Sequence, residues 1–144
     1  MRRRFALSII LLAGLAGAAA ARAADSLPGP IPAIVLRTID GDTLLVRAHV
    51  WLDQEIVTRV RLAGIDAPEM HGQCPSERAA AQAARTYLSG LVRDGAVALT
   101  DIHQDKYGGR VVARAAVMGR DLSAAMLAAD MARPYTGGKR RGWC

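Results

Sequence analysis

The chain has 144 residues, 22% of them charged, a formal net charge of +6, and no internal repeats or low-complexity tracts. This length fits one domain with a modest core, and the irregular sequence excludes a repeat array. Four of the 19 Lys and Arg lie in the first 23 residues, which leaves 15 against 13 acidic residues and a net charge of +2 in the remainder. So small a charge is only weak evidence for an anionic partner.

Residues 1–23 have the three parts of a secretory signal peptide. Arg2, Arg3 and Arg4 form a basic head, FALSIILLAGLAGAAA is an uninterrupted apolar run, and Ala21-Arg22-Ala23 matches an A-x-A cleavage pattern. We therefore expect an exported protein, periplasmic or secreted, with no stable membrane association after cleavage. The alternative is a membrane anchor, although the run is short for the roughly 20 apolar residues that a span needs.

Residues 24–32 are rich in Pro, Gly and Ser and are expected to form a flexible leader. Three strand patterns follow, and the second and third are joined by a tight turn at Asp53-Gln54. In the third pattern apolar residues alternate with Arg59 and Arg61, which predicts one apolar face and one face that carries arginines. The three predicted strands cover residues 33–39, 43–52 and 55–65.

Residues 75–95 change to a helical period, with Ser76 as the expected N-cap and Gly95 as the stop. Two further strand patterns, 96–103 and 110–118, come next. A second helix over residues 121–132 is expected to begin at the capping residue Asp121. The predicted shared face of the first helix contains Ala79, Ala83, Thr86, Tyr87 and Leu91.

The order of these elements, β-β-β-α-β-β-α, decides between fold classes. A sandwich needs more strands, and a doubly wound parallel sheet needs a regular alternation of strand and helix. The sequence therefore predicts an α+β, mainly β fold, a five-stranded Greek-key barrel of the OB type with two helices packed on it. This domain covers residues 33–135, and residues 136–144 form a polar C-terminal tail.

The chain has two cysteines, Cys74 and Cys144. An even number of cysteines in an oxidising compartment indicates a disulfide, here one that closes a loop of about 70 residues. Two free thiols are the alternative. Neither cysteine has the spacing of a redox motif or a zinc site, which argues against metal binding through sulfur.

Three groups of polar residues lie at the ends of predicted strands. Asp40 and Asp42 come between the first two strands, and Arg61 precedes the turn that contains Asp66 and Glu69. Carboxylates brought together repel one another unless a cation neutralises them, and hard oxygen ligands suit Ca²⁺ or Mg²⁺. A cation beside arginine is a combination that binds phosphate, and a spare carboxylate can orient or deprotonate a water. The third group is the loop from Asp105 to Arg110, which contains Tyr107.

Each group alone is compatible with an ordinary turn or loop, but their joint order is more specific. The segments IDGDT, RLAGIDAPE and DKYGGR resemble the three signature segments of the staphylococcal (micrococcal) nuclease, or thermonuclease, family. The resemblance covers residues 33–135. It implies an OB barrel and Ca²⁺-dependent, sugar-non-specific hydrolysis of DNA and RNA phosphodiesters that leaves 3′-phosphates. We expect a monomer, because nothing in the pattern requires a dimer.

The resemblance also implies a role for each matched residue. Asp42 and Asp66 would be Ca²⁺ ligands, helped by the backbone carbonyl of Ala67, with Asp40 behind them. Glu69 would be the general base or would orient the attacking water. The remaining matched residues are two arginines for the scissile phosphate and two tyrosines for the nucleotide pocket: Arg61, Arg110, Tyr107 and Tyr135.

The sequence departs from the family pattern in the third segment, where Gly109 is an extra residue before Arg110. A bulge at the two glycines would keep the arginine on its side of the strand. The rival hypothesis is a non-catalytic nucleic-acid or protein-binding module on the same fold, since OB barrels bind widely without catalysis. The complete set of acids and arginines favours hydrolysis, because a degenerate binding copy would be expected to lose it.

Overall fold

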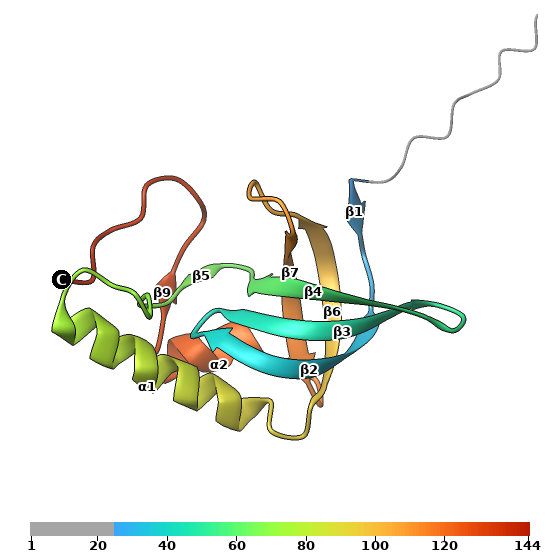
Figure 1. The fold of residues 1–144 in the computed structure, drawn as a ribbon, viewed down its shortest axis with the longest axis horizontal. Coiled ribbons are helices and arrows are strands. Elements are labelled where there is room, and N and C mark those ends of the chain that lie inside the picture. The colour runs from blue at the N-terminus through green and yellow to red at the C-terminus, as the bar shows by residue number, and fades with distance from the viewer. Residues whose placement is uncertain (1–24) are drawn as a thin grey trace, which may run out of the picture.

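The computed structural model describes residues 25–144, and the predicted signal peptide lies outside them. The described chain is mainly β, with two helices packed beside a barrel (Figure 1). Within this range, neither helix is long and apolar enough to cross a membrane. The elements in chain order are β1 (Ser26–Leu27), β2 (Ile31–Asp40), β3 (Thr43–Trp51), β4 (Gln54–Leu62), β5 (Ile65–Asp66), α1 (Pro75–Leu91), β6 (Ala96–Gln104), β7 (Arg110–Val117), β8 (Arg120–Asp121), α2 (Leu122–Ala128) and β9 (Arg133–Pro134).

Five of these strands close into a ring, which confirms the predicted OB-type barrel. β2, β3 and β4 form an antiparallel meander, and β4 then pairs in parallel with β7, with Arg61 opposite Val112. β7 pairs with β6, and β6 pairs with β2, so the sheet returns to its first strand. The barrel interior and the helices share one apolar core, whose largest members include Leu44, Leu62, Ile65, Leu88, Leu99, Leu122 and Met126.

The alternation predicted for the third strand is present in β4 only near its end. Val60 and Leu62 are buried in the core, and Arg61 is partly exposed on the opposite face. The first half of β4 is exposed, because it belongs to the β3–β4 hairpin that extends away from the barrel (Figure 1). The hairpin turn lies at Leu52-Asp53, one residue earlier than predicted, since Trp51 pairs with Gln54 and Asp53 takes the left-handed conformation at φ 55°.

The prediction for the first helix was right about its existence and wrong about its details. α1 begins at Pro75 with Cys74, not Ser76, as its N-cap, and it ends at Leu91, before Gly95. Its buried residues do not form the predicted face, because the alanine-rich sequence allows several apolar stripes and the barrel selects one. The buried residues are Glu77, Ala81, Ala84 and Leu88, whereas Ala79, Ala83 and Thr86 are exposed.

Three two-residue strands, β1, β8 and β9, were absent from the sequence prediction. β1 lies in the segment expected to be a flexible leader and pairs with Ile102 and His103, and β2 already begins at Ile31. Asp121 caps α2 as predicted, accepting the amide of Ala124 at 2.8 Å, but this helix ends at Ala128. Beyond the predicted end of this helix, Arg133–Pro134 form β9, which pairs with β5 and sets Arg133 opposite Asp66.

Candidate active site

The turn between β2 and β3 fixes the first carboxylate of the site. Asp42 is 4% exposed, and its Oδ1 accepts the hydroxyl of Thr43 at 2.8 Å. Its Oδ2 accepts the backbone amide of Ala67 at 3.2 Å, which ties this turn to the segment after β5. Asp40 lies on the same turn, and burial, followed by the charges of Glu69 and Asp42, raises the pKa of its carboxyl above the ordinary value.

Gly41, between these two aspartates, packs directly on α1. Gly41→Ala is expected to lower the free energy of unfolding by about 1–3 kcal/mol. The reason is that a Cβ there would lie 2.6 Å from the Cβ of Ala84 and 2.9 Å from that of Ala67. Both neighbours are short side chains, so relief requires a shift of the turn or of the helix.

The matched control is Gly90→Ala, within α1, where a Cβ would meet nothing in residues 25–144 within 4 Å. That change is expected to raise the free energy of unfolding by about 0.5–1 kcal/mol. Thermal unfolding of the two variants measures the difference, and a shift of the same sign and size in both would contradict the close packing at Gly41.

Asp66, on β5, is the second buried carboxylate, at 2% exposure. Its Oδ2 accepts Nε and Nη2 of Arg133 at 3.1 and 2.8 Å, because β9 holds that arginine on the neighbouring strand. Oδ2 also accepts the indole Nε1–H of Trp143 at 3.2 Å. Oδ1 is buried and has no hydrogen-bond partner among residues 25–144.

Arg61 joins the two carboxylates from the side of β4. Its Nη1 donates to Asp42 Oδ2 at 3.2 Å, and its Nη2 donates to the carbonyl of Ile65 at 3.1 Å and lies 4.0 Å from Asp66 Oδ1. The guanidinium also lies over the ring of Tyr135, 5.7 Å from its centroid. The structure therefore brings together Asp42 from the β2–β3 turn, Arg61 from β4 and Asp66 from β5.

Glu69 and Arg140 complete this cluster. Arg140 Nη1 donates to Glu69 Oε1, and Arg140 Nη2 lies 2.6 Å from Asp66 Oδ1 and 3.7 Å from Asp42 Oδ2. The 2.6 Å contact between Arg140 Nη2 and Asp66 Oδ1 is an ion pair that lacks the geometry of a hydrogen bond. Burial by itself lowers the pKa of the Arg140 guanidinium. The hydrogen bond to Glu69 and the nearby carboxylates raise it by more, so the net shift of this pKa is upward.

The donor set of the cluster fits a calcium ion. Asp42 and Asp66 offer hard carboxylate oxygens from rigid strand ends, and Ca²⁺ prefers such oxygens together with backbone carbonyls. Asp66 Oδ1 is buried, accepts no hydrogen bond among the described residues and faces the guanidinium of Arg140 at 2.6 Å, so its surroundings suit a cation. Ala67, the predicted carbonyl ligand, is adjacent and 2% exposed.

The third predicted group forms a separate wall of the site. Arg61, Tyr107, Tyr135 and Arg140 all line one pocket, so the two tyrosines predicted for a nucleotide do share it. Arg110 makes no described contact with Asp42, Asp66 or Glu69. Its Nε donates to Asp105 Oδ2 at 2.5 Å, and its guanidinium lies over the ring of Tyr107 at 5.3 Å.

The extra glycine before Arg110 is accommodated without a bulge in β7. Gly109 lies in the turn before the strand at φ 74°, a left-handed conformation that favours glycine. β7 then begins at Arg110, which pairs with Arg59, and Val112 pairs with Arg61. Arg110 therefore leaves the strand on the same face as Arg61, because side chains two residues apart point to one side.

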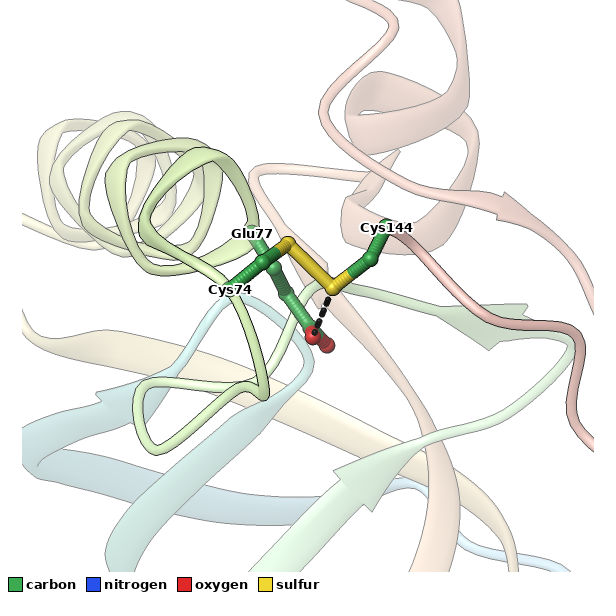
Figure 2. Close-up of side chains that lie close together, drawn as sticks. All are labelled: Cys74, Glu77 and Cys144. Carbon is green, nitrogen blue, oxygen red and sulfur yellow. Dashed lines mark hydrogen bonds between the residues drawn. A yellow bond between two sulfur atoms is a disulfide. The ribbon is translucent and has the colours of Figure 1, made fainter.

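The predicted disulfide is present between Cys74 and Cys144, whose Cα atoms are 6.0 Å apart. Figure 2 shows Glu77 beside it, with Oε2 3.5 Å from Cys144 Sγ. These three side chains lie within 4.8 Å of one another, but disulfide sulfurs lack the thiolate charge that a metal ligand needs. Glu77 instead accepts the amides of Glu69 and Gln73 at 3.4 and 3.0 Å and so fixes the loop that carries Glu69.

Sequence reasoning did not place four residues against the carboxylates or the loop that carries Glu69: Glu77, Arg133, Arg140 and Trp143. Only Glu77 had a recognisable signal, because a glutamate at the third position of a helix often accepts backbone amides before it. The other three lie at or beyond β9, and their partners Asp66 and Glu69 are about 70 residues earlier in the chain. A pattern in the sequence carries no information on that approach.

Comparison with protein families identifies a family for this chain. Residues 59–141, more than half of the chain, match the family model described as staphylococcal nuclease homologue. The matched range contains Arg61, Asp66, Glu69 and Arg110 and begins after Asp42. A search among curated proteins finds no match.

Proposed function

The chain belongs to the staphylococcal nuclease family, and from this premise we propose that it is a Ca²⁺-dependent endonuclease. It hydrolyses DNA and RNA phosphodiester bonds without choice of sugar, by in-line attack of water, and leaves 3′-phosphates. The observation that supports the proposal best is the convergence of Asp42, Asp66, Arg61 and Glu69 in one cluster.

Each member of the cluster has a proposed task. Asp42, Asp66 and the Ala67 carbonyl would hold Ca²⁺, with Asp40 behind them, and Ca²⁺ held there would supply Lewis-acid polarisation of a phosphoryl oxygen. Arg61 offers a two-pronged guanidinium that binds the phosphate and stabilises charge as it develops. Glu69 is the general base, and its side chain, 47% exposed, can reach a water.

The pocket beside the cluster supports nucleic acid as the substrate. Tyr107 and Tyr135 offer aromatic faces on which bases stack, and stacking tolerates any base and either sugar. Arg110 is the second proposed phosphate ligand. To act, its guanidinium must exchange Asp105 for the phosphate, a rotation that its place at the start of β7 allows.

We also propose that the protein acts outside the cytoplasm, in the periplasm or the medium. The pattern of residues 1–23 is that of an export signal. The Cys74–Cys144 disulfide supports the same compartment, because disulfides persist where the environment is oxidising.

The proposal is tested by digestion of single-stranded DNA with the purified protein, first with Ca²⁺ and then with EGTA. Cleavage is expected with Ca²⁺ only. Glu69→Ala is expected to lower the rate by about 10²–10⁴-fold, the usual contribution of a general base. Analysis of end-labelled products shows whether they end in 3′-phosphates. The same assay with RNA in place of DNA tests the lack of sugar preference.

The matched control is Glu55→Ala, an exposed glutamate on the β3–β4 hairpin, which pairs only with Arg47 at 3.4 Å among the described ion pairs. Its rate is expected to equal that of the wild type. A folded wild-type protein that binds DNA and cleaves it at no Ca²⁺ concentration would overturn the nuclease and establish the binding module instead.

A further inference from the structure

The C-terminal tail, residues 136–144, lies over the carboxylate cluster. The chain leaves β9, loops out and returns toward the start of α1, where it ends (Figure 1). Arg133 holds the returning segment, since its Nη1 donates to the carbonyl of Gly142 at 3.0 Å and its guanidinium lies 4.1 Å from the ring centroid of Trp143. Cys144 then joins the tail covalently to Cys74.

We propose that Arg140 on this tail is an internal cation that occupies the carboxylate cluster and competes with Ca²⁺ for it. The inference rests on the proposed function, because it concerns the proposed Ca²⁺ site. It goes beyond that function, since it makes the affinity for Ca²⁺ a property of the tail as well as of the ligands.

The position of Arg140 is the first argument. One guanidinium contacts three carboxylates, those of Asp66, Asp42 and Glu69. Its Nη2 is 2.6 Å from Asp66 Oδ1, whereas Ca²⁺ lies about 2.3–2.6 Å from its oxygen ligands. An ion held by Asp66 Oδ1 and Asp42 Oδ2 would therefore occupy the space that Nη2 takes, and the two cations exclude each other.

The other arginines of the cluster have less of this conflict, since Arg61 shares Asp42 Oδ2 but lies 4.0 Å from Asp66 Oδ1. Arg61 donates to the carbonyl of Ile65, and Arg133 donates to Asp66 Oδ2 and to the tail backbone, so both have anchors away from Oδ1. Arg140 has only the carboxylates as partners among the described hydrogen bonds and ion pairs. Its side chain is 38% exposed, so it can rotate into solvent without opening the core.

The tether is the second argument. A free guanidinium would compete weakly, but Arg140 is linked to the site at both ends of a short segment, by β9 before it and by Cys144 after it. A tethered group acts at a high effective concentration, in the millimolar range or above for short linkers. The contacts of Arg133 with Gly142 and of Trp143 with Asp66 add to this by holding the segment that follows Arg140.

The test is calorimetric titration of Ca²⁺, without nucleic acid, into the oxidised wild-type protein and into Arg140→Ala, in 0.15 M NaCl. The variant is expected to bind Ca²⁺ about tenfold more tightly, which corresponds to a site that Arg140 leaves free about one tenth of the time. Arg140→Gln is the second variant, because it keeps most of the side chain while removing its charge, and unchanged melting temperatures confirm that both variants fold.

The matched control is Arg141→Ala, which removes the same charge from the adjacent residue, whose described contact is through its backbone carbonyl. Since the Arg141 side chain is exposed and makes no ion pair among the described ones, and salt screens exposed charges, this change is expected to alter the affinity by less than about twofold.

Three outcomes are distinguishable. Tighter binding in both Arg140 variants and not in Arg141→Ala supports the inference. Equal affinity in all four proteins overturns the inference and leaves the Ca²⁺-dependent nuclease standing. Absence of Ca²⁺ binding in every protein overturns both the inference and the calcium part of the proposed function.

Discussion

Replacing Arg61 with alanine is expected to lower the rate of Ca²⁺-dependent cleavage by about 10³–10⁵-fold, the range found for arginines that stabilise charge on a transferred phosphoryl group. The side chain is only 12% exposed, and its two nitrogens are fixed on Asp42 and on the carbonyl of Ile65. A donor held in this way does not have to reorient when the phosphate binds. Its removal is therefore expected to destabilise the transition state more than it weakens substrate binding. Steady-state cleavage of a short labelled oligonucleotide measures the loss.

Two further variants decide how the loss of Arg61 is read. Arg61→Lys keeps the charge but has no planar fork, so an intermediate rate is expected. Arg59→Ala removes an exposed arginine from the same strand, two residues earlier, and should leave the rate unchanged. A folded Arg61→Ala protein that cleaves within tenfold of the wild type would remove this residue from the phosphate site.

The barrel and the central cluster could be predicted because their signals are local. Strand alternation and turn residues gave the five barrel strands and their order. Asp42 and Asp66 each follow or precede a strand directly, so the meander of neighbouring strands brings their side chains together. The resemblance of short segments to a known family then assigned roles to residues whose positions were already constrained.

The other features of the fold and of the site depend on contacts that no local sequence pattern encodes. The buried stripe of α1 could not be read, because alanines occur on several faces and only the barrel surface selects Ala81 and Ala84. β9 has two residues and no alternation to detect, yet it places Arg133 against Asp66. The tail looked like a polar terminus, and its basic residues gave no sign that Arg140 would reach Glu69, 71 residues earlier.

These omissions share a physical cause. Arg133, Arg140 and Trp143 are placed by the closure of a long loop, which the disulfide of Cys74 and Cys144 completes across a separation of 70 residues. The sequence shows the two cysteines, but it does not show which side chains their pairing brings to the site. The tail is therefore the part of the site for which the structure adds most.

Loss of this disulfide is expected to be the largest effect on stability. The double variant Cys74→Ser with Cys144→Ser should lose about 4 kcal/mol of unfolding free energy if the chain-entropy model holds for a loop of this length, and about 2 kcal/mol if native strain or residual structure reduces the gain. Urea denaturation of the oxidised protein, the reduced protein and the double variant measures it, with the slope of the transition compared as well as its midpoint.

The reduced wild type is the internal control, since it should match the double variant, which in turn should not respond to reductant.

Tryptophan fluorescence shows where in the molecule the change occurs. Trp143 and Trp51 are the two tryptophans of the chain, and Trp51 is already 71% exposed, so a Trp51→Phe background isolates Trp143. Reduction should shift the Trp143 emission to longer wavelength before global unfolding, because the indole loses its place between Arg133 and Asp66 when the tail is released. Equal urea midpoints for the oxidised and reduced proteins would show that the contacts of Arg133 and Trp143 hold the tail without the covalent bond.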